Sequence, residues 1–152
     1  MIQTGETVPD FTLPDQSGTP TSLESLLASG PVVLFFYPKA MTTGCTKESC
    51  HFRDLAGEFA ELGAQRVGIS ADRVDKQAAF DAKHSLGYPL LSDPDRAVAR
   101  IFGVKRPGPI MNKRATFVIG TDRRVLAAIS SETNMDVHAD QALDVLRRAT
   151  AS

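Results

Sequence analysis

The sequence predicts an α/β domain in which a mixed sheet of four or five strands is flanked by helices on both faces. Short runs of β-branched and aromatic residues alternate along the chain with segments of helical periodicity, an order typical of layered α/β domains. Two runs, residues 116–119 and 125–130, are separated by a short turn and predict a hairpin, so part of the sheet is antiparallel. The chain has 152 residues. That length corresponds to one domain, residues 1–152, with its own core.

The first half of the chain is predicted to contain one buried central strand followed by a long helix. Residues 11–13 form a short extended piece, and residues 22–28 a short helix that Gly30 ends. Residues 32–37 are apolar without alternation, as in a strand buried on both faces. The helix is expected from about Cys45 to Leu62, with apolar positions at helical spacing at Phe52, Leu55, Phe59 and Leu62.

The second half continues the alternation. Strands are predicted at residues 67–70 and 89–91, and a polar helix at 74–84. Asp93 and Pro94 are expected to start the next helix, which turns Val98, Ile101 and Phe102 inward. A loop is expected over residues 105–112. The last helix begins near Asp136 and is expected to bury Ala142, Val145, Leu146 and Ala149.

Composition excludes several classes of function. The formal net charge is −1, so the chain lacks the basic footprint of a nucleic-acid-binding protein. Its longest apolar run, residues 32–37, is far shorter than the roughly 20 residues that span a bilayer. The N-terminal segment MIQTGETVPD has no basic stretch before an apolar one, so we expect a cytoplasmic protein without a secretory signal. Two cysteines are too few for a disulfide scaffold and suggest redox or catalytic chemistry.

Cys45 lies where the buried strand and its turn pass into the long helix. In the first turn of a helix the backbone N–H groups are unpaired and the helix dipole is positive. Such a position stabilises a thiolate, which is the nucleophilic form of cysteine. Lys47 adds a positive charge nearby. The alternative is an inert cysteine that packs as a small apolar side chain.

Cys50 lies five residues after Cys45. Five residues of an ideal helix rise about 7.5 Å and separate the two Cα atoms by roughly 8.6 Å. A disulfide needs Cα atoms within about 7 Å. The two thiols therefore cannot bond while both residues stay helical, and a disulfide between them would require the start of the helix to unwind. The alternative for Cys50 is an ordinary core position of the helix.

A metal site is not expected. Cys45, Cys50 and His51 form C-x4-C-H, but a structural zinc site needs four ligands, and His84 and His138 are remote in the sequence.

Three strings of the sequence carry a family resemblance. The first, FFYPKAMTTGCTKESCHFRD, contains the pattern Pro-x-x-x-Thr-x-x-Cys at Pro38, Thr42 and Cys45; the others are SDPDRAVARIFGVKR and RATFVIGTD. With them the chain resembles the peroxiredoxins over roughly residues 5 to 148, and most of all the bacterioferritin comigratory protein (PrxQ) subfamily. That subfamily commonly has proline where Thr43 stands, which we expect to change the stiffness of the loop and not the chemistry.

The resemblance implies a thioredoxin-like fold and a thiol-dependent peroxidase of antioxidant defence. By this resemblance, the protein would reduce hydrogen peroxide and organic hydroperoxides without metal, flavin or haem. Cys45 would be the peroxidatic cysteine and Cys50 the resolving cysteine, which together form a redox disulfide. Thioredoxin or a glutaredoxin-like dithiol would reduce that disulfide. We expect a monomer, with a dimer as the alternative.

The resemblance also implies roles for neighbouring residues. Thr42, Gly44 and Arg114 would bind the peroxide, and Arg114 would also stabilise the thiolate. Pro38 would shield the site, and Glu48 matches an acidic residue of the subfamily near it. From the residues alone, Thr42 is equally explained as a helix cap, and an arginine at the edge of a strand as a solvated side chain.

Other functions remain open. A thioredoxin-type disulfide reductase would carry Cys-x-x-Cys, whereas the spacing here is Cys-x4-Cys. A redox sensor would change shape when Cys45 and Cys50 bond but would not turn over. A chaperone-like holdase has no feature of this sequence in its favour.

Overall fold

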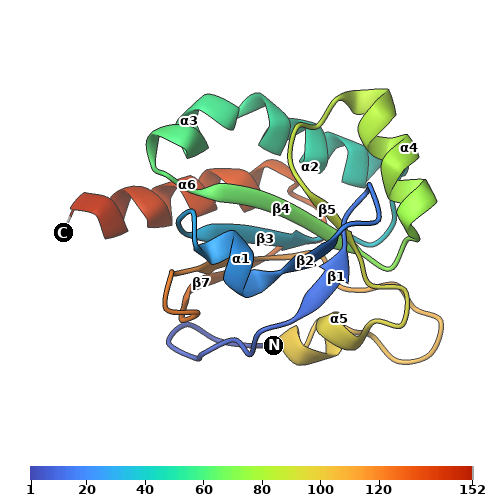
Figure 1. Ribbon diagram of the computed structural model, residues 1–152, viewed down its shortest axis with the longest axis horizontal. Coiled ribbons are helices and arrows are strands. Elements are labelled where there is room, and N and C mark those ends of the chain that lie inside the picture. Colours follow the sequence, from blue (N-terminus) through green and yellow to red (C-terminus); the bar gives the residue numbers. More distant parts are fainter. Residues whose placement is uncertain (152) are drawn as a thin grey trace.

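The computed structural model describes residues 1–151 and has an α/β architecture (Figure 1). Its elements in chain order are β1 (Thr12–Pro14), β2 (Pro20–Ser22), α1 (Leu23–Leu27), β3 (Val32–Phe36), α2 (Thr43–Asp54), α3 (Ala56–Glu61), β4 (Gln65–Ser70), α4 (Val74–His84), β5 (Leu90–Ser92), α5 (Ala97–Phe102), β6 (Ala115–Ile119), β7 (Val125–Ser130) and α6 (Asp136–Ala151). Within residues 1–151, none of these helices combines the length and the apolar character needed to cross a membrane.

The central sheet has five strands in the order β5-β4-β3-β6-β7. β3, β4 and β5 are parallel, whereas β6 is antiparallel to both β3 and β7. Every residue of β3 and β6 is buried, because these strands lie in the middle of the sheet and both of their faces are covered. The predicted mixed sheet and its C-terminal hairpin are confirmed. β1 and β2 form a separate two-stranded sheet.

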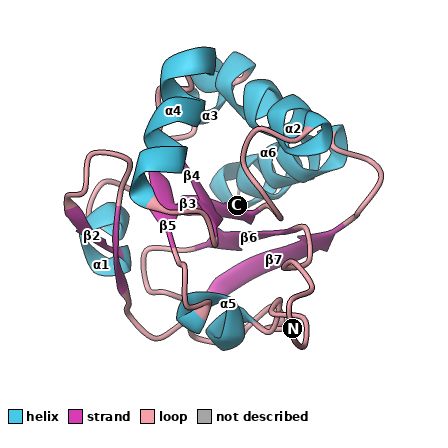
Figure 2. Cartoon of the chain, turned by 90° about the vertical axis from the view of Figure 1, so that its right-hand side faces the viewer, coloured by secondary structure: helices cyan, strands magenta, loops and turns pink. Residues whose placement is uncertain are grey.

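Helices cover both faces of the sheet, as predicted (Figure 2). Alternate residues of β3 point to opposite faces. Val33 and Phe35 belong to the core cluster shared with α2, α3, α4 and α6. Leu34 and Phe36 belong to the cluster shared with α1 and α5. The sheet is therefore the middle layer of three.

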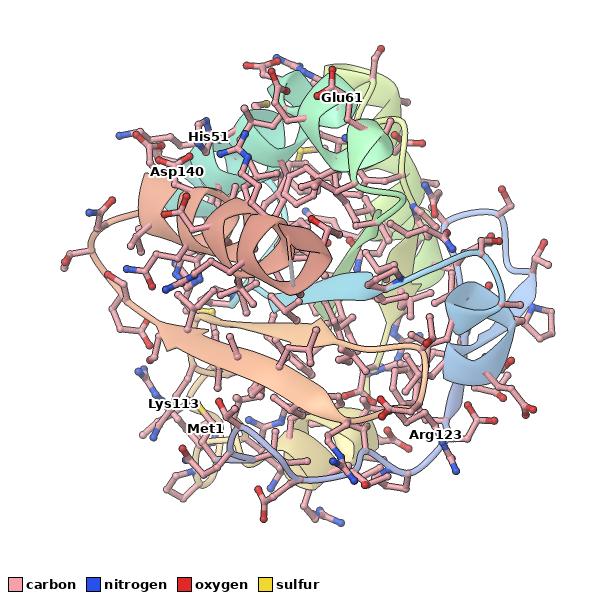
Figure 3. All side chains as sticks on the ribbon, turned by 90° about the vertical axis from the view of Figure 1, so that its left-hand side faces the viewer. Met1, His51, Glu61, Lys113, Arg123 and Asp140 are labelled. Atoms are coloured by element: carbon pink, nitrogen blue, oxygen red, sulfur yellow. The ribbon has the colours of Figure 1, made fainter. Side chains whose placement is uncertain are left out.

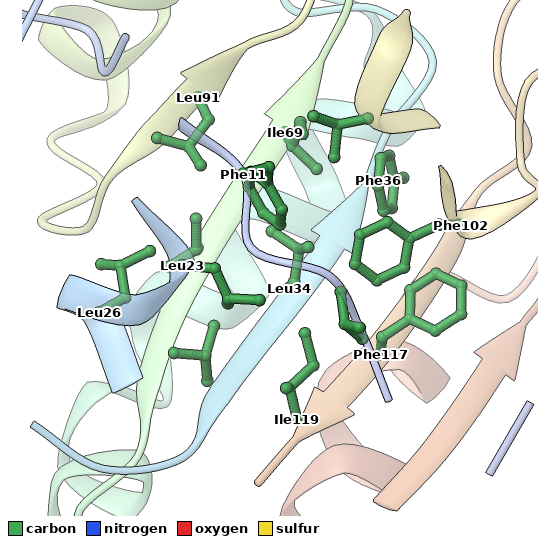
Figure 4. Packing of buried hydrophobic residues seen from close by; sticks show 14 of the residues in the cluster. Phe11, Leu23, Leu26, Leu34, Phe36, Ile69, Leu91, Phe102, Phe117 and Ile119 are labelled. Carbon is green, nitrogen blue, oxygen red and sulfur yellow. The ribbon is translucent and has the colours of Figure 1, made fainter. Parts of the chain in front are cut away.

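Aromatic contacts fix α5 against its face of the sheet (Figure 4). The ring centroid of Phe102 on α5 lies 5.1 Å from that of Phe36 and 4.8 Å from that of Phe117. On the opposite face, Phe52 of α2 stacks on Phe35 at 4.1 Å with an interplanar angle of 7°. Phe52 thus attaches the helix that carries both cysteines to the central strand.

The helix predicted from Cys45 to Leu62 is wrong in its bounds. α2 begins at Thr43, and Leu55 separates it from α3 with a backbone outside the helical region (φ −94°, ψ 19°). Apolar periodicity continues across this kink, because Phe52 and Phe59 are seven residues apart, close to two helical turns, and both are buried. The sequence pattern therefore could not reveal the interruption.

Two predictions of burial are also wrong. Ile101 is 39% exposed, because Val98, Ala99 and Phe102 form the buried stripe of α5 and Ile101 lies about 100° from the centre of that stripe. Ala149 is exposed, because the last turns of α6 project beyond the sheet (Figure 1).

The start of α5 also differs from the prediction. The helix begins at Ala97, not at Pro94. Asp93 nevertheless serves its first turn, since its carboxylate accepts the N–H groups of Val98 (3.2 Å) and Ala99 (2.9 Å).

The different surroundings of Phe52 and Ile101 give a paired stability test. Phe52→Ala is expected to lower the free energy of unfolding by about 3–5 kcal/mol, because it opens a cavity between α2 and the sheet. Ile101→Ala, the control on an exposed helix position, is expected to cost less than about 1 kcal/mol. Urea unfolding followed by far-ultraviolet circular dichroism measures both. Equal losses for the two variants would contradict this packing.

Candidate active site

Cys45 lies in the first turn of α2, as predicted. Thr42 is the N-cap residue, and its carbonyl accepts the N–H of Thr46 at 2.9 Å. Cys45 is therefore the third helical residue. Its backbone N–H lies just before that of Thr46, the first N–H of α2 with a hydrogen bond to a carbonyl within the helix. The residue is completely buried. Its sulfur thus faces the positive end of the helix dipole in surroundings with little water.

The turn that leads from β3 to α2 is held from the neighbouring strand β4. The Asp72 carboxylate, just beyond β4, accepts the backbone N–H of Ala40 and the hydroxyl of Ser70, both at 2.7 Å. Met41 has a positive φ of 69°, a conformation that a non-glycine residue adopts at a cost. These contacts fix the place at which α2 begins.

Arg114 reaches Cys45 because of the sheet register. β6 is antiparallel to β3 and pairs Ala115 with Phe36, so the residue before Ala115 lies beside the end of β3 from which the chain turns into α2. There the Arg114 Nη2 donates to the Cys45 sulfur at 3.3 Å, and its Nη1 donates to Glu48 Oε1 at 2.8 Å. The Arg114 side chain is only 7% exposed, so it is not the solvated arginine of the alternative interpretation.

Glu48 is the second group that shares the Arg114 guanidinium. It lies one turn after Cys45 on α2 and has no exposed surface. Burial raises its pKa to about 8, although the charge and hydrogen bond of Arg114 act in the opposite direction. This shift favours the protonated carboxyl, which takes less of the Arg114 charge away from the sulfur than a carboxylate would.

Two residues that the sequence did not single out complete the buried cluster. His138 on α6 and Thr116 on β6 are fully buried. The Thr116 Oγ1 lies 2.8 Å from His138 Nδ1, and Glu48 Oε2 lies 3.7 Å from the same nitrogen. Thr116 was predicted only as part of a strand. His138 was judged remote, and no local spacing could have indicated its position, because α6 packs over β6 only in the folded chain.

A further acidic group, Glu132, fixes the backbone of Arg114. Its Oε1 accepts the Arg114 backbone N–H at 3.1 Å and the Arg106 guanidinium at 2.7 Å. The segment before β6 is thus tied to the segment after β7.

The other residues predicted for the site, Thr42, Gly44 and Pro38, differ in their burial and in their contacts. Thr42 is exposed, and its hydroxyl donates to the Lys39 carbonyl at 2.7 Å instead of capping α2. At Gly44 a Cβ atom would lie 3.3 Å from Arg114 Nη2 and 3.3 Å from the Met135 Cε, so glycine allows the guanidinium to pack closely on the helix. Pro38 follows the buried Tyr37 and is half-buried.

Cys50 is half-buried on the same helix, and both thiols are free. Both residues lie within α2, so the spacing argument applies: the two thiols cannot bond while this part of the helix stays regular. Among residues 1–151, no three histidine, cysteine or acidic side chains gather in a way that could hold a metal ion.

Comparison with known proteins gives consistent results. The model of the AhpC/TSA family matches residues 4–128. A protein of Mycobacterium tuberculosis whose name places it among the peroxiredoxins is 64% identical over 149 residues, which cover 96% of this chain and 97% of that protein.

Two solved structures show the same fold. The crystal structure of peroxidoxin BcpB from M. tuberculosis has a TM-score of 0.95 and 62% identity over 97% of this chain and 98% of that one. The bacterioferritin comigratory protein of Xanthomonas campestris, whose structure is described for alkyl peroxide reduction, has a TM-score of 0.85 and 33% identity over 93% and 92% of the two chains. The fold is thus the thioredoxin-like fold of these proteins, and the chain belongs to the AhpC/TSA family of peroxiredoxins, which are thiol-dependent peroxidases.

Proposed function

We propose that Cys45 is the peroxidatic cysteine of a two-cysteine peroxidase and that Arg114 is its principal partner. The observation that supports this most is the 3.3 Å contact between Arg114 Nη2 and the Cys45 sulfur inside the fold. A buried guanidinium stabilises the thiolate, and its planar group carries further N–H donors that are able to bind the oxygens of a peroxide.

In the first step the Cys45 thiolate attacks the terminal oxygen of the peroxide. A sulfur–oxygen bond forms, the oxygen–oxygen bond breaks, and the leaving oxygen takes a proton to depart as water or an alcohol. Arg114 and the unpaired N–H of Cys45 stabilise the charge that moves from sulfur to oxygen. Thr42 binds the peroxide, Gly44 leaves room for Arg114, and Pro38 shields the reaction from water. The product is the sulfenic acid of Cys45.

In the second step the thiol of Cys50 condenses with that sulfenic acid. A disulfide forms and one water leaves. α2 must unwind between the two cysteines for this step, because the helical spacing keeps the sulfurs apart. A dithiol reductant, thioredoxin or a glutaredoxin-like protein, then reduces the disulfide by thiol–disulfide exchange and restores both thiols.

The proposal for the substrates draws on the related proteins. Hydrogen peroxide and organic hydroperoxides are the proposed substrates, and the alkyl peroxide reduction named for the Xanthomonas structure supports the second group. We propose a cytoplasmic monomer that needs no cofactor, since the thiolate itself is the redox group.

Three contacts hold the part of α2 that surrounds Cys50. The Tyr88 hydroxyl donates to the Ser49 carbonyl at 2.7 Å, and the Arg66 Nη1 donates to the Phe52 carbonyl at 2.9 Å. On the outer side, His51 pairs with Asp140 of α6 at 2.8 Å (Figure 3). The first turns of α2 can therefore unwind while its second half stays attached, with the boundary near Ser49.

Intact mass after rapid quenching tests the two-step reaction. One equivalent of hydrogen peroxide is expected to convert the wild-type protein into a species about two daltons lighter, the disulfide. Cys50→Ser is expected to stop at a sulfenic acid that a dimedone-type reagent traps, and Cys45→Ser is expected not to react. Oxidation of wild type no faster than that of a free thiol, or a disulfide that no dithiol protein reduces, would favour the sensor over the peroxidase.

Tyr88→Phe tests where unwinding stops. Removal of the hydroxyl releases the Ser49 carbonyl, and a hydrogen bond of this kind contributes about 0.5–1.5 kcal/mol. Disulfide formation is therefore expected to accelerate by about 2- to 10-fold, while the rate of Cys45 oxidation stays unchanged. Quenched-flow mass analysis separates the two rates.

The matched control for this variant is Tyr37→Phe, whose hydroxyl donates to Gln77 and not to α2. It is expected to change neither rate. If Tyr88→Phe also leaves the second rate unchanged, unwinding ends before Ser49.

A further inference from the structure

The buried cluster behind Arg114 restricts the protonation state of His138. The His138 Nε2 lies 2.8 Å from the carbonyl oxygen of Ser131. A carbonyl only accepts, so Nε2 carries a proton. In a neutral imidazole Nδ1 is then an acceptor, and the Thr116 hydroxyl, 2.8 Å away, donates to it.

Glu48 presents one oxygen to this acceptor without a hydrogen bond. Its Oε1 accepts from Arg114, but its Oε2 is buried without a hydrogen-bond partner and lies 3.7 Å from His138 Nδ1. A carboxylate oxygen facing an acceptor lone pair in a buried site is unfavourable. A single proton, carried either by Glu48 Oε2 or by His138 Nδ1, removes this contact between two acceptors.

We propose that His138 is a positioning residue for the reaction at Cys45: it keeps one proton on the Glu48–His138 pair, in competition with the Thr116 hydroxyl, so that the charge of Arg114 remains available to the sulfur. This inference rests on the proposed role of Cys45. With the proton on Glu48 both groups are neutral. With the proton on His138 they form an ion pair of zero net charge. In both arrangements the pair leaves the positive charge of Arg114 uncompensated except by the Cys45 thiolate.

The groups around Glu48 favour the neutral arrangement. Those that face it are Arg114 before β6, His138 on α6, Glu132 after β7, Tyr88 before β5 and Cys45 on its own helix. Burial lowers the pKa of His138 and raises that of Glu48 to about 8. Loss of the shared proton at alkaline pH leaves a carboxylate, which competes with the sulfur for Arg114.

Two variants are expected to shift this proton loss in opposite directions. In His138→Phe the Nδ1 acceptor that favours the protonated Glu48 carboxyl is gone, so proton loss moves to lower pH. In Thr116→Val, Nδ1 has only the Glu48 carboxyl as a donor, so proton loss moves to higher pH. We expect about one pH unit each way. His84→Phe, on the partly exposed end of α4, is the control and is expected to cause no shift.

Infrared difference spectroscopy measures the proton directly and does not depend on activity. The carbonyl band of a protonated buried carboxylic acid, identified as the band that Glu48→Gln removes, is expected to disappear around pH 8 in the wild-type protein. Subtraction of the Glu48→Gln spectrum is needed because Asp93 is also buried. The nitrogen resonances of His138 are expected to report the Nε2–H tautomer.

The rate of Cys45 oxidation, measured by quenched-flow mass analysis in a Cys50→Ser background, is expected to follow the same titration. In the wild-type protein this rate should fall by about tenfold above the pH midpoint of proton loss. The midpoint should lie at lower pH in His138→Phe and at higher pH in Thr116→Val. Absence of the Glu48 band at neutral pH together with a neutral His138 imidazole, or shifts of the same sign in the two variants, would overturn the proposal.

The two proposals fail in different ways. If the band and its shifts appear as expected but Cys45 reacts with peroxide no faster than a free thiol, the peroxidase assignment has failed and the proton assignment has not. If His138→Phe does not fold, Thr116→Val and the His138 resonances of the wild-type protein still decide the question.

Discussion

A guanidinium buried between a sulfur and a carboxyl group is the interaction on which the arrangement of this site depends. Arg114 can contact Cys45 and Glu48 together because they lie three residues apart on α2 and so face the same side of the helix. Two features of the fold hold Arg114 and the start of α2 in the positions that this contact needs. The register of β3 with β6 places Arg114 at the end of the sheet where α2 starts, and Asp72 fixes the turn between. A one-residue slip of β6 would turn the side chain to the other face.

Helix α2 must satisfy two opposed requirements under the proposed reaction. For the attack it must be intact, since its first turn supplies unpaired N–H groups and its second turn supplies Glu48. For the disulfide it must open between the cysteines. The structure separates these requirements along the helix: Phe52 and the carbonyls of Ser49 and Phe52 are held from the sheet side. The first turn carries Cys45, whose sulfur contacts Arg114, the contact that the proposed oxidation would alter.

The layers of the fold could be predicted because β3 is a continuous apolar run, as expected of a strand covered on both faces, and because strand and helix patterns alternate along the chain. The place of Cys45 followed from the strand–turn–helix order. Arg114 could be proposed only through the family resemblance, because its position depends on pairing between strands far apart in the sequence. His138 was missed for the same reason: its partners come from α2, β6 and the segment before α6. The kink at Leu55 leaves the apolar period intact and so gave no signal.

The most direct test of this account is the second-order rate constant for oxidation of Cys45 by hydrogen peroxide in Arg114→Gln, in a Cys50→Ser background at neutral pH. Glutamine keeps polar atoms in the site but removes the charge that the thiolate and the transition state are proposed to need. The account predicts a loss of about 10²- to 10³-fold, with Arg114→Lys recovering only part of it because lysine cannot contact the sulfur and Glu48 with a rigid fork of donors. A rate within about threefold of the Cys50→Ser parent would contradict the central role of the Arg114–Cys45 contact.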